Sequence, residues 1–407
     1  MNLSDAWGAR LGVRLRLKGG AAAPLQDGAC AAFRRPRRRL GACGERFALR
    51  WEPTRRRAAP DADGGPLFIR SPYRGGVNAP RPLGRNPHPL VIAHRGASGH
   101  RVEHSRAAYE LGIAQGADAV EPDLVPTRDG VLVVRHENEI SGTTDVAERP
   151  EFAHRRRSRT VDGKRLDGWF TEDFTWAELQ GLRLRERLPK LRPSNDVRAT
   201  GGGMLRFVDL LDLLEAADRP VRLIAEIKHA AHFEAAGFPM HELLLAELGS
   251  RLDGLVTVES FEQTVLRQLR ASGFGGRTVL LAEASGAPAD LVARHGSTAP
   301  DYASFLTDEG LAAIAAEEHG VSVDKTLLLG RSDTTDLVDR AHAAGLEVYA
   351  WTLRPENAFL APRHRGPGGR AAHGDWRAEF RAVLATGLDG VFADHPDLAL
   401  AVRAGLA

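Results

Sequence analysis

The amino-acid sequence predicts an α/β fold, a (β/α)₈ TIM barrel, and three observations support this fold class. Short apolar runs that are typical of buried parallel strands alternate with helical segments over about 310 residues. About eight such runs are found, which favours a closed barrel over an open doubly wound sheet. Acidic and histidine residues directly follow several runs, and the carboxyl ends of the strands form the active-site face of such barrels.

Local patterns justify the individual elements. Residues 90–93 are a short apolar run, and Ser105 can cap a helix that ends near Gly116, because glycine suits the position after a helix. Residues 131–134 are extended and follow a turn at 128–130. The predicted strands cover residues 90–93, 119–125, 131–134, 222–227, 255–258, 278–282, 302–306, 347–352 and 390–393. The predicted helices cover residues 105–116, 208–217, 261–271, 308–319 and 335–344.

Two segments differ in composition from the rest of the barrel, which is predicted to span residues 86–407. Residues 1–85 are rich in Arg, Ala, Gly and Pro, which predicts a disordered tail because little apolar surface offsets the ordering entropy. This basic tail could bind acidic lipid or nucleic acid, but a dispensable segment or a misassigned translation start is the preferred interpretation. Residues 141–205 are polar and break the strand–helix rhythm, so they are predicted to form a small insertion near the barrel mouth.

Charge is distributed unevenly along the chain, although the formal net charge is only +2. Residues 1–89 carry 18 Lys/Arg and 6 Asp/Glu, whereas the remainder carries 37 basic and 47 acidic residues. An acidic globular body argues against a nucleic-acid partner, since polyanions bind basic surfaces. No apolar run is long enough to predict a transmembrane segment. Charged residues interrupt any signal-peptide core, which slightly favours the cytoplasm, and export is expected only if translation starts elsewhere.

Reactive side chains collect at the predicted carboxyl ends of the first extended segments. These residues are His94, Arg95, Glu121, Asp123, His136, Glu226 and Lys228. Because strand carboxyl ends meet at one face of a barrel, we expect these side chains to share one site.

The carboxylates Glu121, Asp123 and Glu226 predict a metal site. Residues 121 and 123 lie two apart on a strand, so their side chains point the same way. Paired inward carboxylates repel each other and lose solvation unless a cation lies between them. Carboxylate oxygens suit a hard cation, Ca²⁺ or Mg²⁺, better than zinc. The alternative interpretation is a structural ion network in which these acids pair with Arg95 and Lys228.

His94 and His136 are a natural acid–base couple, since imidazole titrates near neutrality. One imidazole can take a proton from the attacking oxygen while the other protonates the leaving alkoxide. Arg95 offers a bidentate fork to a phosphate, and Lys228 offers a point charge near the proposed metal ligands.

Taken together, these motifs resemble the glycerophosphodiester phosphodiesterase family. The resemblance runs from about Leu90 to Arg403 and includes softer stretches at 140–146, 185–189 and 258–261, which are similar to a larger bacterial subgroup with an insertion after the second strand. The motifs that carry it are His94-Arg95-Gly96, Glu103-His104-Ser105, Glu121-Pro122-Asp123, His136 and Glu226-Ile227-Lys228-His229. The resemblance implies a (β/α)₈ barrel, a divalent cation, often Ca²⁺ or Mg²⁺, and hydrolysis to glycerol 3-phosphate and an alcohol.

The resemblance also implies roles for individual residues. His94 and His136 would be the acid–base pair, and Arg95 and Lys228 would contact phosphate. Glu121, Asp123 and Glu226 would bind the metal, and Glu103 would orient neighbouring groups. Trp351 is similar to an aromatic residue of the family's pocket, although a core tryptophan explains it nearly as well. The sequence departs from the family pattern at Val102, Ser105 and Glu137, where proline, threonine and aspartate are usual.

The resulting hypothesis is metal-dependent hydrolysis of a small-molecule glycerophosphodiester by two histidines acting as acid and base. Two alternatives stay open: a barrel phosphodiesterase acting on other phospholipid headgroups, and a catalytically silent barrel that binds phosphoesters. The sequence does not tell which histidine is the acid, whether a cyclic phosphate forms, which headgroup is preferred, or which oligomer forms.

Overall fold

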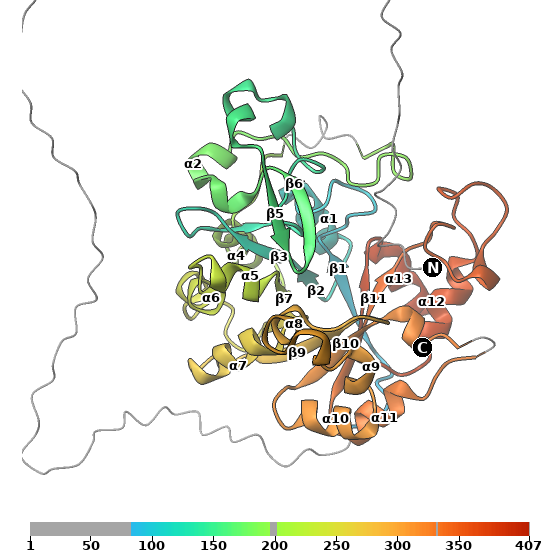
Figure 1. Cartoon of the computed structure of the whole chain (residues 1–407). Coiled ribbons are helices and arrows are strands. Elements are labelled where there is room, and N and C mark those ends of the chain that lie inside the picture. The colour runs from blue at the N-terminus through green and yellow to red at the C-terminus, as the bar shows by residue number, and fades with distance from the viewer. Residues whose placement is uncertain (1–82, 196–201, 331–332, 407) are drawn as a thin grey trace, which may run out of the picture. The chain divides into compact units, whose positions relative to one another are not determined.

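The structure of the chain is a computed structural model that describes residues 83–195, 202–330 and 333–406. Parallel strands form a closed barrel, and helices cover its outside (Figure 1). The barrel strands are β1 (Leu90–His94), β2 (Ala119–Glu121) with its continuation β3 (Asp123–Pro126), β7 (Arg222–Ile227), β8 (Val256–Ser260), β9 (Arg277–Ala282), β10 (Gly320–Asp324), β11 (Glu347–Leu353) and β12 (Gly390–Ala393). The barrel closes because β1 pairs with both β2 and β12, and β2 pairs with β7. The predicted (β/α)₈ barrel is therefore confirmed.

The helices follow the strands and pack against their outer faces. They are α1 (Arg106–Ala114), α4 (Phe207–Glu215), α5 (Ala230–Ala235), α6 (Met240–Leu248), α7 (Gln263–Ala271), α8 (Ala289–His295), α9 (Tyr302–Phe305), α10 (Asp308–Ala315), α11 (Leu337–Ala343), α12 (Trp376–Leu384) and α13 (Pro396–Ala404). α1 begins as predicted, since the Ser105 side chain accepts a hydrogen bond from Ala108 N at 3.1 Å. Gly116 adopts φ +92°, which suits its predicted place beyond the end of this helix.

Two strand predictions need correction, and the predicted strand at residues 131–134 is confirmed. Residues 302–306 are not a strand; they contain α9, whose Asp301 cap accepts a hydrogen bond from Ser304 N. The strand at this place in the barrel is β10, which was not predicted because only Val321 and Val323 are strongly apolar in it. The predicted strand 119–125 is divided into β2 and β3 at Pro122, whose nitrogen has no hydrogen to donate. Residues 132–134 form β4 (Leu132–Val134), which pairs antiparallel with β3 and is therefore not one of the parallel strands of the barrel.

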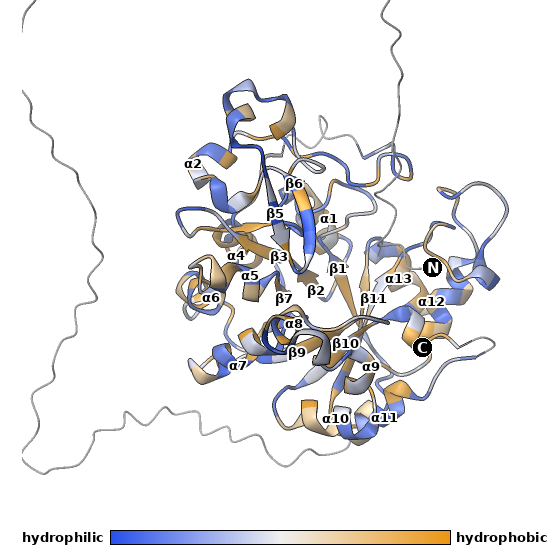
Figure 2. Cartoon of the chain, in the orientation of Figure 1, coloured by the Kyte–Doolittle hydropathy of each residue, from blue (hydrophilic) through white to orange (hydrophobic). Residues whose placement is uncertain are grey.

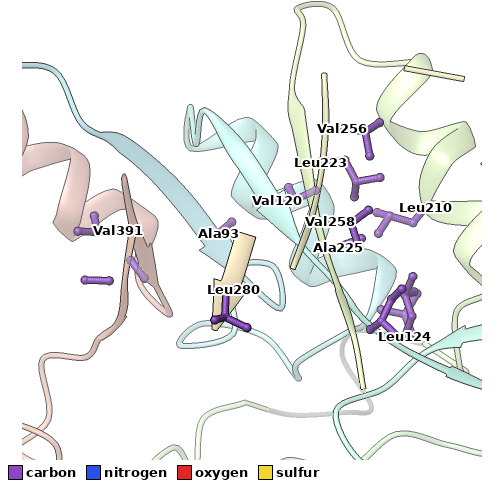
Figure 3. Packing of buried hydrophobic residues seen from close by; sticks show 14 of the residues in the cluster. Ala93, Val120, Leu124, Leu210, Leu223, Ala225, Val256, Val258, Leu280 and Val391 are labelled. Carbon is purple, nitrogen blue, oxygen red and sulfur yellow. The ribbon is translucent and has the colours of Figure 1, made fainter. Parts of the chain in front are cut away.

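Along each barrel strand, successive residues face in turn the interior of the barrel and the surrounding helices. The interior layer contains Ile92, Ala119, Ile224, Val279, Tyr349 and Phe392. Figure 2 shows hydrophobic strands in the centre of the molecule. The intervening positions face the helices; Figure 3 shows Leu210 of α4 among the strand residues Ala225 and Val258. Each fully buried leucine or valine contributes roughly 1.5–3 kcal/mol, so this layer holds the helices on the barrel.

The predicted insertion forms a substructure of its own between β4 and α4. It contains the antiparallel hairpin of β5 (Arg157–Val161) and β6 (Lys164–Gly168), the short helix α2 (Trp176–Leu179) and several 3₁₀ turns. The hairpin is largely hydrophilic (Figure 2). At its tip, Asp162 Oδ2 lies 2.5 Å from His229 Nδ1, directly after β7, so the hairpin reaches the carboxyl end of a barrel strand.

The predicted tail lies almost entirely outside the described residues, and its disorder stays a prediction. Within the described part, Leu83 N donates to His342 O at 2.8 Å, and Arg85 pairs with Asp339. Residues 83 and 85 thus contact the barrel, and the predicted boundary at residues 85 and 86 stays a prediction. Among the described residues, no helix is long and apolar enough to cross a membrane.

Candidate active site

The strand register places the predicted reactive residues in one row. His94 on β1 lies opposite Glu121 on β2, and Asp123 on β3 lies opposite Glu226 on β7. Glu226 in turn lies opposite Glu259 on β8. His94, Glu121 and Glu226 each follow an interior apolar residue by two positions, so they form the next inward layer, at the carboxyl ends of the strands.

The turn after β1 positions Arg95. Arg95 and Gly96 both have positive φ, +59° and +79°. A Cβ on residue 96 would lie 2.5 Å from the backbone carbon of Ala108 in α1, so only glycine fits there. The tight turn lets Arg95 N donate to Glu121 Oε2 at 2.9 Å, which fixes the arginine beside the acids.

Three buried carboxylates gather at one point: Glu121, Glu226 and Glu259 offer oxygens that lie within 4.8 Å of one another. Burial, and next the charge of Asp123, raises the pKa of Glu121 well above its ordinary value. Burial also raises the pKa of Glu226 to about 8 and that of Glu259 well above normal. Among the described residues, Glu259 Oε2 is buried without a hydrogen-bond partner. Clustered carboxylate oxygens, one of them without a partner, suit a hard divalent cation, so this trio could hold one.

Asp123 has different partners from the trio. Its Oδ1 lies 3.3 Å from Lys228 Nζ, and its Oδ2 lies 2.9 Å from His104 Nε2 and 3.3 Å from Arg95 Nε. Burial alone would raise the pKa of Asp123, but the charges of Lys228 and Arg95 hold it well below its usual range. Of the predicted metal ligands, the structure brings the oxygens of Glu121 and Glu226 together. Asp123 and Glu226 also make ion pairs of the kind that the alternative interpretation described.

His94 is oriented by a buried carboxylate. Its Nδ1 lies 2.6 Å from Asp394 Oδ1, directly after β12. Asp394 Oδ2 accepts hydrogen bonds from Arg192 Nη2 and Arg354 Nε, each at 2.7 Å. Burial, and next Arg95, lowers the pKa of His94 to about 4. An ionised partner at Nδ1 favours the tautomer with the proton there, which leaves Nε2 as a basic nitrogen.

His136 is arranged in the same way. Its Nδ1 lies 2.7 Å from Glu137 Oε1, and both oxygens of Glu137 accept hydrogen bonds from Arg187 at 2.6 Å. Burial, and next Arg95 and Lys228, lowers the pKa of His136 to about 3. The imidazole is thus neutral near pH 7, and its Nε2 is directed away from the carboxylate.

A small pocket brings several of these groups together. His94, Arg95 and Asp394 line it from the barrel, and Arg187 and Arg192 line it from the insertion. The insertion therefore forms part of the wall of the site, as expected of a segment near the barrel mouth.

Comparison with known proteins shows which family the chain belongs to. The model of the glycerophosphoryl diester phosphodiesterase family matches residues 94–398. The chain belongs to this family. Glycerophosphodiester phosphodiesterase GDPD6 of Arabidopsis thaliana is 30% identical over 294 residues, which cover 67% of this chain and 76% of that protein. The activity predicted from the motifs, that of a glycerophosphodiester phosphodiesterase, is thereby confirmed.

Solved structures show the same fold. A crystal structure from Silicibacter pomeroyi DSS-3 matches with a TM-score of 0.56 and 24% identity, covering 79% of this chain and 95% of that one. A phosphodiesterase from Oleispira antarctica, solved with the product sn-glycerol-3-phosphate, matches with a TM-score of 0.52 and 18% identity, covering 77% of this chain and 96% of that one.

In this phosphodiesterase barrel, the predicted phosphate-contacting groups lie beside the acids. Lys228 Nζ lies 2.7 Å from Glu226 Oε1 and 5.6 Å from the centroid of the Phe261 ring. Trp351 is half-buried and packs edge-to-face on Phe261, with centroids 5.8 Å apart. The Phe261 ring thus contacts both Trp351 and Lys228.

Glu103 links two of the site's arginines. Glu103 Oε2 accepts from Arg95 Nη1 at 3.1 Å and from Arg187 Nε at 2.8 Å, and Glu103 Oε1 accepts from Arg187 Nη2 at 2.5 Å.

Sequence reasoning missed several residues of this phosphodiesterase site. They are His104, Arg187, Arg192, Glu259, Arg354 and Asp394. Signals existed for four of them. His104, Arg187 and Glu259 all lie in segments that resemble the family, and Asp394 directly follows a predicted strand, as the chosen residues did. Only the fold brings Arg192 and Arg354 to Asp394, because nothing local in the sequence marks them.

Proposed function

We propose that the chain hydrolyses glycerophosphodiesters to glycerol 3-phosphate and an alcohol, with a divalent cation and with His94 and His136 as acid and base. The observation that carries this proposal is the pairing of each imidazole, through Nδ1, with its own ionised carboxylate. Both Nε2 atoms are then available for proton transfer in a site that also contains Arg95, Lys228 and a buried acid trio.

The chemistry of the donors supports a hard cation, Ca²⁺ or Mg²⁺. Glu121, Glu226 and Glu259 would hold it, and the raised pKa values of these buried acids reflect repulsion and lost solvation that a bound cation relieves. The motif resemblance names Asp123 in place of Glu259. When bound, the cation would neutralise phosphodiester charge and so act as a Lewis acid.

The chain's own residues would perform the remaining steps. The Arg95 guanidinium and the Lys228 ammonium bind phosphate oxygens and favour the charge that builds in the transition state. Trp351 would line the substrate pocket, as the resemblance implies, and Glu103 would hold Arg95 in place through their ion pair. One histidine accepts the proton of the nucleophile, either the neighbouring glycerol hydroxyl or water. The other histidine protonates the departing alcohol at Nε2, and a bound phosphodiester anion raises the pKa of the imidazole that must carry this proton.

The direct test is release of glycerol 3-phosphate from glycerophosphocholine by the purified chain, with and without EDTA. We expect release that EDTA abolishes and that added Ca²⁺ or Mg²⁺ restores. Release that EDTA does not change would contradict the role of the cation. No release, together with cleavage of a lysophospholipid or a phosphoinositide, would favour the alternative substrate class.

A further inference from the structure

Arg187 contacts two parts of the proposed machinery that lie in different segments of the chain. Its guanidinium donates to both oxygens of Glu137, the carboxylate that holds His136 Nδ1. It also donates to both oxygens of Glu103, the carboxylate that holds Arg95 Nη1. One side chain of the insertion thus joins the phosphate-contacting arginine to a proton-transferring histidine.

We propose that Arg187 is a positioning residue, which sets His136 and Arg95 at fixed places relative to one another. This inference rests on the proposed function, because it assigns Arg187 a role through the histidine and the arginine that the reaction uses. It also gives the insertion a task in catalysis beyond lining the mouth of the barrel.

The number of rotatable bonds in Glu137 and its partial exposure are the physical reason that positioning is needed. Glu137 lies in a segment outside the strands, and its side chain is 32% exposed. A glutamate there has three rotatable bonds and can turn toward water, so its neighbour His136 alone does not fix it. The planar fork of Arg187 engages both oxygens at once, which a lysine could not do.

Three other arginines of the insertion, Arg155, Arg159 and Arg185, contact no carboxylate that holds His94 or His136 and provide a comparison. Arg155 pairs with Glu178 at 2.5 Å, and Arg159 pairs with Glu172 at 2.8 Å, so these two tie the insertion to itself. Arg185, two residues before Arg187, pairs with the exposed Glu148. Arg185→Met therefore removes the same charge from the same segment without touching a carboxylate that holds a histidine.

The test compares the full chains of wild type, R187M, R187K and R185M. Turnover of glycerophosphocholine is measured alongside ¹⁵N NMR of histidine-labelled protein, with the His136 signals assigned by their loss in H136A. We expect R187M to lower kcat/KM by about 10- to 100-fold, the usual effect of losing a group that orients a functional side chain. We also expect the Nδ1–H tautomer of His136 to give way to a mixture. R187K keeps the positive charge, so its kcat/KM should lie between those of wild type and R187M. The kcat/KM of R185M should match that of wild type.

The two readouts separate this proposal from the proposed function. Unchanged His136 tautomer signals in both R187M and R187K would overturn the positioning role, whatever the activity. Equal losses in R187M and R185M would overturn it as well. Full activity of H136A would instead contradict the acid–base assignment, and the tautomer signals would still decide the role of Arg187.

Discussion

In this barrel, acidic and basic side chains lie within a few ångströms of one another, and the partners of each carboxylate determine its chemical role. Glu121, Glu226 and Glu259 lie together, and among the described residues Glu259 Oε2 has no hydrogen-bond partner, whereas Asp123 contacts Lys228, His104 and Arg95. The first arrangement suits a bound cation, and the second suits an ionised carboxylate that pairs with neighbouring cations.

This difference leads to a prediction about Glu259. Glu259→Gln keeps the volume but removes a charged oxygen donor, so we expect affinity for Mg²⁺ or Ca²⁺ to fall by about tenfold or more. Isothermal titration calorimetry measures the affinity, and Glu283→Gln, at an exposed position after β9, is the matched control. A larger loss in Asp123→Asn than in Glu259→Gln would contradict the trio and support the ligand set that the motifs imply.

Among the secondary-structure elements, the strands differ in how well the sequence predicts them. Apolar runs such as 90–93 and 222–227 were sufficient to predict β1 and β7, because short apolar runs of this kind are typical of strands that are buried on both faces. The error at 302–306 arose because a short apolar run also suits a helix, and the cap at Asp301 decides between them. β10 was overlooked because its apolar content is small.

The connection from α10 to β10 gives a prediction about pH and stability. Glu318 is 4% exposed, and burial raises its pKa to about 7. The folded chain therefore ionises at a higher pH than the unfolded chain, so stability should fall as pH rises from about 4.5 to about 7. Glu318→Gln removes this loss and should stabilise the protein at pH 8 by up to about 3 kcal/mol. Urea unfolding at pH 5 and pH 8 measures the effect, and an equal change at both pH values would refute the role of Glu318 ionisation.

For the whole molecule, the sequence predicted the barrel, the face that carries the site and most of the polar groups there. The positions of His94, Glu121 and Glu226 follow from strand periodicity alone, since side chains two apart share a face. The partners of the histidines could not be predicted fully. Asp394 lies 300 residues from His94, and Arg187 lies 50 residues from Glu137 in an insertion without a regular period. Only closure of the barrel and folding of the insertion bring such groups together.

In the proposed reaction, carboxylates hold the cation while histidines transfer protons, and H136A separates these two tasks. Calcium or magnesium binding and glycerol 3-phosphate release are measured on the same preparations of wild type and H136A. We expect equal cation affinity and a release rate that is lower by about 10² to 10⁴ in H136A, the usual contribution of acid–base catalysis. Wild-type release by H136A with its cation bound would show that this division of tasks is wrong.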